Sequence, residues 1–568
     1  MDSFPILSLL VWLPVAGAVA VALLPARVAK ATGLGVAGAT LVVAAVAALS
    51  YDTGGGRQLE EVHTWIEAFG VHYALGLDGL GLLLVLLTVL LVPVVLAAEW
   101  VKADDPGGAG AKTFVAWALA LEGLSLAVFC ATDVFLFYVV FEATLIPAYF
   151  LVGGFGRDGR GAAALKFLMF QLAGGLVLLA AVIGLYVVSA DAGQPSYLLS
   201  DLEELSIGTE AGRWLFLGFF IAFAIKAPLF PLHTWLADTT EKATPGTGVL
   251  LVCILDKIGT FGMLRFCLGI FPEASQWATP LVITLALISV VYGALLAIGS
   301  DDLFRLIGLT SLSHFGLITL GIFTLSSQGG AGAILYMVNH GLGTAALFLV
   351  AGYLFDRRGT ASIRELGGAE KTAPVLAGLF LVAGLATLGL PGLSPFVSEF
   401  LVLLAAFGYA WYVGAIAITA VVLSAIYVLW AYQRIMTGPD PAVLAEGGEE
   451  PHEPTGREPT GHEPTGHEPT GHEPAGSGAT GTAVRTAPAA EQSVATTTTT
   501  RDLGVREVAA VAPLVAALVF FGFYPAPMLD VANPTVSDLL DQVGVSDEAP
   551  SVGPGDLAGH GDAEEGAH

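Results

Sequence analysis

Long apolar runs constrain the fold of this chain more than any other feature. A helix needs roughly 20 consecutive apolar residues to cross the hydrocarbon core of a bilayer. Fourteen such helices can be placed along the sequence, at residues 5–24, 31–50, 77–98, 113–130, 133–152, 162–188, 213–237, 245–269, 277–299, 303–324, 330–355, 373–409, 411–436 and 506–525. We therefore expect an all-α polytopic membrane protein with about 14 transmembrane helices.

The composition excludes an ordinary soluble domain. Hydrophobic residues make up 55% of the 568 residues and charged residues only 13%, whereas soluble domains carry about 25% charged residues. Much of the net charge of −26 follows Met436, so the charge does not indicate a nucleic-acid partner. Cys130, Cys253 and Cys267 lie in apolar helices without metal-ligand spacing, which argues against disulfides and iron–sulfur ligation. The first apolar run lacks a basic leader and a cleavage motif, so we interpret it as a spanning helix.

Two of the expected helices contain interior prolines. Pro228 and Pro231 interrupt the seventh helix, and Pro391 and Pro395 interrupt the twelfth. Proline lacks a backbone donor and breaks a helix, and such a break persists in lipid only beside protein or a wet cavity. Interrupted helices at matching positions of two halves point to a transport site. Since each half has five helices, the two halves should be inverted repeats.

A second motif and a change in composition complete the expected organisation. Asp133-Val134-Phe135-Leu136 resembles Asp302-Leu303-Phe304-Arg305 in the other half. The pentapeptide His452-Glu453-Pro454-Thr455-Gly456 recurs through a polar segment that cannot bury a core and should be disordered; metal binding by its histidines stays an alternative. We expect N-terminal helices at residues 1–112, a first repeat at 113–270 and a second repeat at 271–437. A linker at 438–505, a last helix at 506–526 and a flexible acidic tail at 527–568 should follow.

Basic residues are distributed unequally between the loops on the two sides of the expected bundle. One side carries Arg27, Lys30, Lys102, Lys112, Arg157, Arg160, Lys242, Arg357, Arg358, Arg364, Lys371 and Arg434. The other side carries Arg57, Arg213 and Arg265. The richer side is expected to be cytoplasmic, which places both termini on the outer face of the membrane.

Ionisable residues inside the apolar helices are the candidate functional groups. A charge in the hydrocarbon costs several kcal/mol and marks a functional site by default. The candidate proton-transfer residues are Glu142, Lys226, Lys257, His314, His340 and Glu399, with Glu122 and Asp256 as supporting carboxylates beside the four prolines. Burial disfavours the charged form of each group, and a nearby opposite charge restores it. Separation of Glu142 from Lys226 would therefore release a proton from the lysine, which the other groups could pass to Glu399.

Each candidate also has a purely structural interpretation. Glu142 and Lys226 could form a static buried ion pair, and the two histidines could bridge helices by hydrogen bonds. Glu122 could serve helix packing alone. Asp256 precedes Lys257 directly, and adjacent residues do not face each other on a helix, which leaves a partner on another helix as its alternative.

The same residues carry a resemblance to the antiporter-like subunits of bacterial NADH:quinone oxidoreductase, complex I. The segment Asp133 to Glu142 resembles the fifth helix of that family with its essential glutamate, although Phe141 stands where Trp is usual. Lys226 to Leu236 resembles the broken seventh helix, and Ala237-Asp238-Thr239-Thr240 departs from the usual Pro-Asp-Ala-His. The segment around Lys257 is similar to the eighth helix.

Later motifs extend the resemblance from about Leu75 to Met436. Ser311-Leu312-Ser313-His314 and Asn339-His340-Gly341 are similar to the two histidine motifs of the family. The segment Leu390 to Phe400 contains Glu399 where the L- and N-type subunits and the related Mrp antiporter subunits have lysine. The chain therefore resembles the M type.

The resemblance implies a proton-translocating subunit in the membrane arm of respiratory complex I, in a bacterial plasma membrane. Its expected partners are the L- and N-type antiporter-like chains and the lipid bilayer. No cofactor is expected in this chain, because FMN, the iron–sulfur clusters and quinone would belong to other subunits. Two alternatives remain open: a subunit of an Mrp-type Na⁺/H⁺ antiporter, and a non-conducting membrane scaffold.

Overall fold

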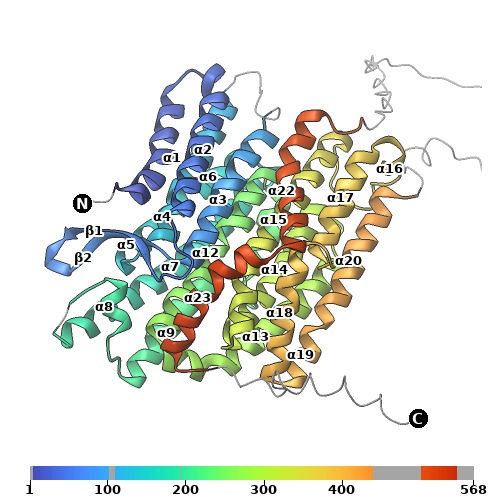
Figure 1. Cartoon of the computed structure of the whole chain (residues 1–568). Helices are drawn as coiled ribbons and strands as arrows, with labels where there is room; N and C mark the ends of the chain where they lie inside the picture. Colours follow the sequence, from blue (N-terminus) through green and yellow to red (C-terminus); the bar gives the residue numbers. More distant parts are fainter. Residues whose placement is uncertain (1–3, 101–108, 194, 439–500, 547–568) are drawn as a thin grey trace, which may run out of the picture.

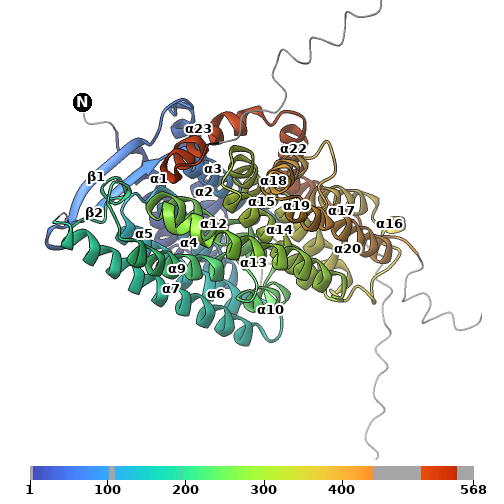
Figure 2. The same ribbon diagram turned by 90° about the horizontal axis from the view of Figure 1, so that it is seen from below.

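The computed structural model describes residues 4–100, 109–193, 195–438 and 501–546, and the helices in these ranges form a long bundle (Figures 1 and 2). Twelve helices of the described part are long and apolar enough to cross a membrane. They are α1 (Ile6–Leu23), α2 (Ala26–Leu49), α3 (Gly79–Ala98), α4 (Ala109–Cys130), α5 with α6 (Val134–Phe155), α7 (Arg160–Asp191), the segment Pro245–Leu268, α13 (Pro272–Ile298), α14 (Leu303–Phe323), α15 (Ser327–Arg358), α19 with α20 (Trp411–Met436) and α22 (Val505–Phe523).

The other two expected spans, 213–237 and 373–409, are each divided into two helices. The first becomes α9 (Thr209–Lys226) and α10 (Thr234–Lys242), and the second becomes α17 (Pro374–Thr387) and α18 (Ser394–Tyr409). The expected count of about 14 spans thus resolves into twelve long helices and two divided ones. Pro228 and Pro231 lie in the first break and Pro391 in the second, where the helical hydrogen-bond ladder cannot continue. Pro395 instead lies in the first turn of α18, where a helix tolerates proline.

The described part is helical except for one β-hairpin, which the sequence-based expectation missed. Strands β1 (Gln58–Ile66) and β2 (Val71–Leu77) pair antiparallel, with Val62 opposite Ala74. The hairpin precedes the helix expected at 77–98, which begins at Gly79 as α3. Asp78 ends the strand and begins α3, because its side chain accepts a hydrogen bond from the backbone N–H of Gly81 at 2.8 Å, as an N-cap residue does.

The two motifs that begin with aspartate have matching local structures. Asp133 caps α5 by accepting from the N–H of Leu136, and Asp302 caps α14 by accepting from the N–H groups of Phe304 and Arg305. Each aspartate also forms an isolated antiparallel bridge, Asp133 with Leu198 and Asp302 with Ser362. The short helices α8 (Leu199–Glu203) and α16 (Ala369–Thr372), which follow these bridges, lie toward opposite ends of the bundle (Figure 1).

The interpretation of residues 527–568 as a flexible tail is wrong up to Val543. Residues Ala526–Val543 form α23, which packs against α3, α13 and α15 (Figure 1). Its buried residues Met528, Ala532, Val536 and Leu540 recur every four positions, which is the period of one helix face. Acidic residues on the opposite face concealed this pattern. Most of the expected linker, at residues 439–500, lies outside the described residues.

Candidate functional site

Lys226 and Glu142 form the first part of the candidate site. Lys226 is the last residue of α9 and is 1% exposed. Its ammonium lies 3.4 Å from Thr144 Oγ1 and 4.6 Å from the centre of the Phe141 ring. Lys226 and Glu142 attract each other electrostatically, but Glu142 Oε1 has no hydrogen-bond partner among the described residues. The two charges are therefore neighbours without a closed ion pair.

Side chains form hydrogen bonds with backbone groups at the proline break directly after Lys226. The indole of Trp235 donates to the carbonyl of Ile225 at 3.0 Å, and the N–H of Phe230 donates to Ser289 Oγ at 2.9 Å. These bonds satisfy backbone groups that the interrupted helix leaves free. The break also places the ammonium at a helix C-terminus, where the helix dipole favours a positive charge.

Lys257 occupies the centre of the candidate site. It begins α12 (Lys257–Gly262), which lies between two π-helical segments, Leu250–Leu255 and Met263–Leu268. Such π-helical turns are rare and frequently occur at functional sites. The side chain is 0% exposed, and its ammonium lies 2.7 Å from His340 Nδ1. An ammonium has no acceptor, so His340 must accept at Nδ1 while the lysine is charged.

Asp256 is buried beside Lys257 and lies near both lysines. Its carboxylate interacts electrostatically with Lys257 and with Lys226, while its Oδ2 has no hydrogen-bond partner among the described residues. A Cβ added to Gly259 would come within 2.4 Å of the backbone nitrogen of Ala227. The close approach of α12 to the end of α9 therefore brings Asp256 toward the first part of the site.

The two histidines continue the site toward the second break. The rings of His314, on α14, and His340, on α15, have centroids 5.2 Å apart. His314 Nδ1 and His340 Nε2 have no hydrogen-bond partner among the described residues. The other nitrogen of His314, Nε2, lies 3.2 Å from the hydroxyl of Tyr427. Two buried imidazoles thus stand next to each other with free nitrogens on both rings.

Glu399 is the last candidate and lies beside the second break. It is buried on α18, and its Oε1 accepts a hydrogen bond from the Tyr336 hydroxyl at 2.6 Å. Gly389, in the break, has a φ of +73°, and a Cβ there would lie 2.0 Å from Glu399 Oε2. Similarly, a Cβ at Gly175 would lie 1.9 Å from Glu142 Oε1. Glu142 and Glu399 therefore each lie directly against a glycine.

Five of the six proton-transfer candidates, together with Asp256, are buried, while Glu142 is half-buried. We call Glu142, Lys226, Lys257, His340, His314 and Glu399 the polar row. Glu122 is not connected to it by any hydrogen bond, and both of its oxygens lack a hydrogen-bond partner among the described residues. Within the described part, no group of His, Cys, Asp or Glu could hold a metal ion.

The sequence-based search missed Tyr336 and Tyr427. Both side chains are buried, and both hydroxyls contact members of the polar row. Tyr336 precedes His340 by four residues on one helix, and residues at this spacing share a helix face. That spacing could have identified Tyr336. The contact of Tyr427 joins two helices that are distant in sequence, so no local pattern could have revealed it.

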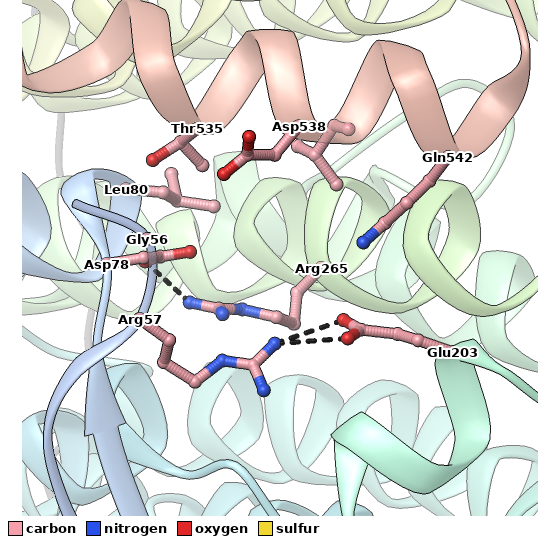
Figure 3. Close-up of a pocket in the computed structure, with 10 residues that line it drawn as sticks. Gly56, Arg57, Asp78, Leu80, Glu203, Arg265, Thr535, Asp538 and Gln542 are labelled. Atoms are coloured by element: carbon pink, nitrogen blue, oxygen red, sulfur yellow. Dashed lines mark hydrogen bonds and ion pairs between the residues drawn. The ribbon is translucent and has the colours of Figure 1, made fainter. Parts of the chain in front are cut away.

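Charged side chains at the two ends of the bundle form separate networks. At one end, Arg57 pairs with Glu203 at 3.1 Å and Arg265 pairs with Asp78 at 2.7 Å, beneath Asp538 of α23 (Figure 3). These residues line a cavity of about 70 Å³. Burial raises the pKa of Glu203 even though Arg57 and Arg265 favour its charged form.

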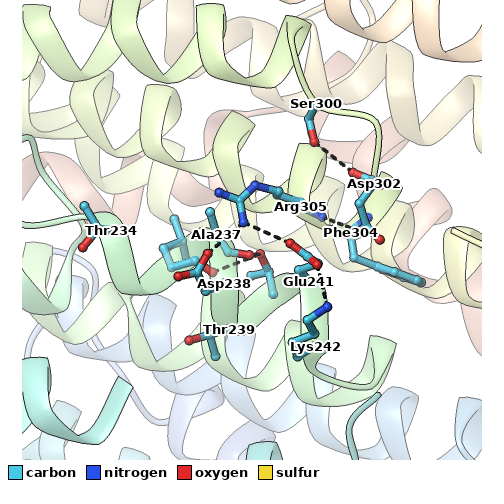
Figure 4. Close-up of polar contacts among 12 residues, drawn as sticks. Thr234, Ala237, Asp238, Thr239, Glu241, Lys242, Ser300, Asp302, Phe304 and Arg305 are labelled. Carbon is cyan, nitrogen blue, oxygen red and sulfur yellow. Dashed lines mark hydrogen bonds and ion pairs between the residues drawn. The ribbon is translucent and has the colours of Figure 1, made fainter. Parts of the chain in front are cut away.

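At the other end, Arg305 of α14 pairs with Asp238 at 2.8 Å and with Glu241 at 3.0 Å, both on α10 (Figure 4). Lys166 of α7 pairs with Asp238 at 2.6 Å. Partial burial favours the neutral form of Asp238, but the hydrogen bonds from Lys166 and Arg305 outweigh it and lower the pKa of this carboxyl. Arg157 similarly pairs with Asp302 at 2.9 Å. The pairs made by Arg305 and Arg157 join residues of the segment 113–270 to residues of the segment 271–437.

Comparisons with known proteins agree with this architecture. The family model described as NADH:quinone oxidoreductase/Mrp antiporter, transmembrane, matches residues 131–424. NADH-quinone oxidoreductase subunit M of Mycobacterium tuberculosis H37Rv is 45% identical over 97% of this chain and 97% of its own length. A chain of respiratory complex I from Thermus thermophilus with bound NADH aligns with a TM-score of 0.77 and 33% identity, covering 95% of this chain and 100% of that chain.

A chain of the Mrp complex from a Dietzia species shares the fold, with a TM-score of 0.76 and 22% identity, covering 95% of this chain and 98% of that chain. The M-type resemblance expected from Glu399 is confirmed by the likeness to subunit M over nearly the whole chain. This chain therefore belongs to the NADH:quinone oxidoreductase/Mrp antiporter transmembrane family, among the M subunits of NADH-quinone oxidoreductase.

Proposed function

We propose that this chain translocates protons in the membrane arm of a respiratory NADH:quinone oxidoreductase. The observation that carries the proposal is the contact of 2.7 Å between Lys257 and His340, two fully buried titratable side chains on different helices. Burying such groups costs free energy, so their presence inside the bundle indicates a function. A lysine and an imidazole at this distance can exchange a proton directly.

The mechanism begins at Glu142 and Lys226. The two are close enough to interact and have no closed ion pair, so a small movement changes their mutual stabilisation. When they separate, the desolvated ammonium of Lys226 loses its counter-charge and releases its proton. Lys257 takes up a proton and donates it to His340 Nδ1. The proton then passes by way of His314 toward Glu399, and a carboxylate in this place can hold it for release.

Access from two sides of the membrane follows from an inverted repeat. Support comes from the matching caps and bridges at Asp133 and Asp302, which are followed by α8 and α16 toward opposite ends of the bundle. Further support comes from the two divided helices, one in each half. Each half would supply one route, the first through the Lys226 break and the second through the Glu399 break.

The end of the bundle that carries Arg157 and Arg305 is the cytoplasmic side in this proposal, because most loop lysines and arginines belong to it. Both termini then face the outside of a bacterial plasma membrane. Neighbouring L- and N-type antiporter-like chains would flank this subunit. NADH oxidation at FMN, electron transfer through iron–sulfur clusters and quinone reduction would take place in other subunits.

The test is proton pumping by the whole complex carrying Glu142→Gln in this chain, reconstituted into liposomes and driven by NADH. Glutamine keeps the size of the side chain and removes its charge. We expect the complex to assemble and to pump fewer protons per NADH oxidised. Undiminished pumping would support the scaffold alternative. A stable assembly that contains this chain and does not oxidise NADH would support the Mrp-type alternative.

A further inference from the structure

Two buried tyrosines lie between the histidines and Glu399. Tyr336 lies on α15 and Tyr427 on α20, and both are almost completely excluded from solvent. The Tyr336 hydroxyl donates to Glu399 Oε1 at 2.6 Å, and the Tyr427 hydroxyl lies 3.2 Å from His314 Nε2. Tyr427 therefore contacts His314 and Tyr336 contacts Glu399, the last two members of the polar row.

Tyr336 and Tyr427 each lie near both His314 and Glu399. Tyr336 interacts electrostatically with Tyr427, and Tyr427 interacts electrostatically with Glu399. The ring of Tyr336 lies 5.9 Å from that of His314, centroid to centroid. Among the described residues no hydrogen bond joins His314 to Glu399, whereas Tyr427 contacts the first and Tyr336 the second.

We propose that Tyr427 and Tyr336 carry the proton between His314 and Glu399. This inference rests on the proposed function, since it describes one segment of the same proton route. A phenol suits the task because its oxygen accepts one hydrogen bond while its O–H donates another. An aromatic side chain packed for shape alone needs no hydroxyl, and phenylalanine fills the same volume.

The transfer conserves protons at every step. His314, protonated on both nitrogens, gives up its Nε2 proton to the oxygen of Tyr427, and the O–H bond that Tyr427 already had breaks as its proton moves on. At the other end, Glu399 Oε1 gains the hydroxyl proton of Tyr336, and the oxygen of Tyr336 gains the proton that comes from Tyr427, directly or through one water molecule. Each tyrosine ends neutral, as it began, and the net change is one proton moved from His314 to Glu399.

The chain offers a matched control on the same helix as Tyr336. Tyr353 also lies on α15 and is buried, and its hydroxyl has no hydrogen-bond partner among the described residues. Tyr353→Phe therefore removes the same atom from a comparable environment outside the polar row. Any general effect of losing a buried hydroxyl from α15 would appear in this variant too.

The experiment compares Tyr336→Phe, Tyr427→Phe and Tyr353→Phe in the complete complex, purified and reconstituted into liposomes, by the initial rate of NADH-driven proton pumping. We expect the first two variants to pump about 10-fold more slowly or worse, and Tyr353→Phe to match the wild type. A positioned proton carrier contributes roughly 10²–10⁴-fold, and a water molecule in place of the lost hydroxyl would recover part of it.

A second measurement separates proton transfer from packing. Fluorotyrosine at position 336 keeps the hydroxyl and the shape of the side chain but makes the phenol more acidic. We expect it to restore pumping and to shift the pH profile of pumping, in a site where Lys257, His314, His340 and Glu399 are the nearby titratable groups. An unchanged pH profile would overturn the carrier role of Tyr336, and wild-type pumping by Tyr427→Phe would overturn that of Tyr427.

Glu399→Gln distinguishes a failure of this inference from a failure of the proposed function. If Glu399→Gln stops pumping while both phenylalanine variants pump normally, the tyrosines are not carriers and the proton route stands. If Glu399→Gln also pumps normally, the route through the second half is wrong and the inference falls with it.

Discussion

The two halves of the polar row differ in how their charges are held. In the first half, Lys226 and Glu142 attract each other, but Glu142 Oε1 has no hydrogen-bond partner among the described residues. In the second half, Lys257 contacts His340 directly and Tyr336 donates to Glu399. In the proposed mechanism, the first half is a charge pair that opens and closes, and the second half is a chain of groups that passes a proton along.

The largest expected effect comes from removing the positive charge of the first half. Lys226→Met leaves Glu142 and Asp256 without this counter-charge and removes the proton donor. We expect NADH-driven pumping in reconstituted vesicles to fall by about 100-fold or more, as for loss of a positioned proton donor. Lys226→Arg is the control for charge alone. It should keep the electrostatic attraction but pump poorly, because a guanidinium does not deprotonate in proteins.

Normal pumping by Lys226→Met would show that the pair in the first half is static. The proposed contrast would then be wrong, because the pair of Lys226 and Glu142 would not open during pumping. Normal pumping by Lys226→Arg alone would show that a permanent positive charge is sufficient, without any release of a proton from this position.

A smaller effect is expected from filling the space beside each glutamate. Gly389→Ala would bring a methyl group against the Glu399 carboxylate and place a Cβ on a residue with a φ of +73°, which costs about 1–2 kcal/mol on its own. At Gly175, which lies in an ordinary helix, the three atoms nearest to an added Cβ all belong to the Glu142 carboxylate. We therefore expect Gly389→Ala to lower thermal stability more than Gly175→Ala, and both to slow pumping.

Gly378→Ala is the matched control for both glycine variants, because no atom of the described residues lies within 4 Å of the added methyl group. It should leave pumping unchanged and stabilise α17 slightly, by about 0.5–1 kcal/mol. If Gly175→Ala pumps as well as Gly378→Ala, the position of the Glu142 carboxylate does not matter for the opening of the pair.

The smallest effect is expected at the ion pairs that join α10 to α14 near the surface. Arg305→Gln breaks ion pairs with Asp238 and Glu241 whose side chains are more than a fifth exposed, and exposed pairs contribute about 0–1 kcal/mol. We expect a small loss of thermal stability, largest at low salt, with pumping nearly intact. Strong uncoupling of pumping from NADH oxidation would instead show that this network transmits movement between α10 and α14.

The sequence predicted the features that depend on local chemistry. Prolines Pro228 and Pro391 correctly marked the two divided helices, because a missing backbone donor weakens the helix at that position. Proline alone does not decide the outcome, since Pro14 and Pro280 lie inside continuous helices. Uninterrupted apolar runs likewise located the long helices, although Thr144 divides α5 from α6 within one of them. The six charged and histidine members of the polar row were identified because such side chains are costly in an apolar helix.

Features that depend on tertiary contacts were missed. The hairpin β1–β2 is short and carries polar residues on both faces, so it produces no clear alternation. The apolar stripe of α23 is hidden in an acidic segment, and the helix is held by contacts such as the hydrogen bond from Gly79 N–H to Thr535 Oγ1. Tyr427 reaches His314 across 113 positions of sequence. The hairpin and the Tyr427 contact leave no clear local pattern, and the pattern of α23 is masked by its acidic residues.

The measurement that tests the central claim most directly is the number of protons pumped per NADH oxidised by the complete complex with Lys257→Met in this chain. Methionine keeps the length and apolar bulk of the lysine but removes the ammonium that contacts His340. If the polar row is a single proton route, the assembled complex should pump fewer protons per NADH than the wild type. A ratio equal to that of the wild type would contradict it.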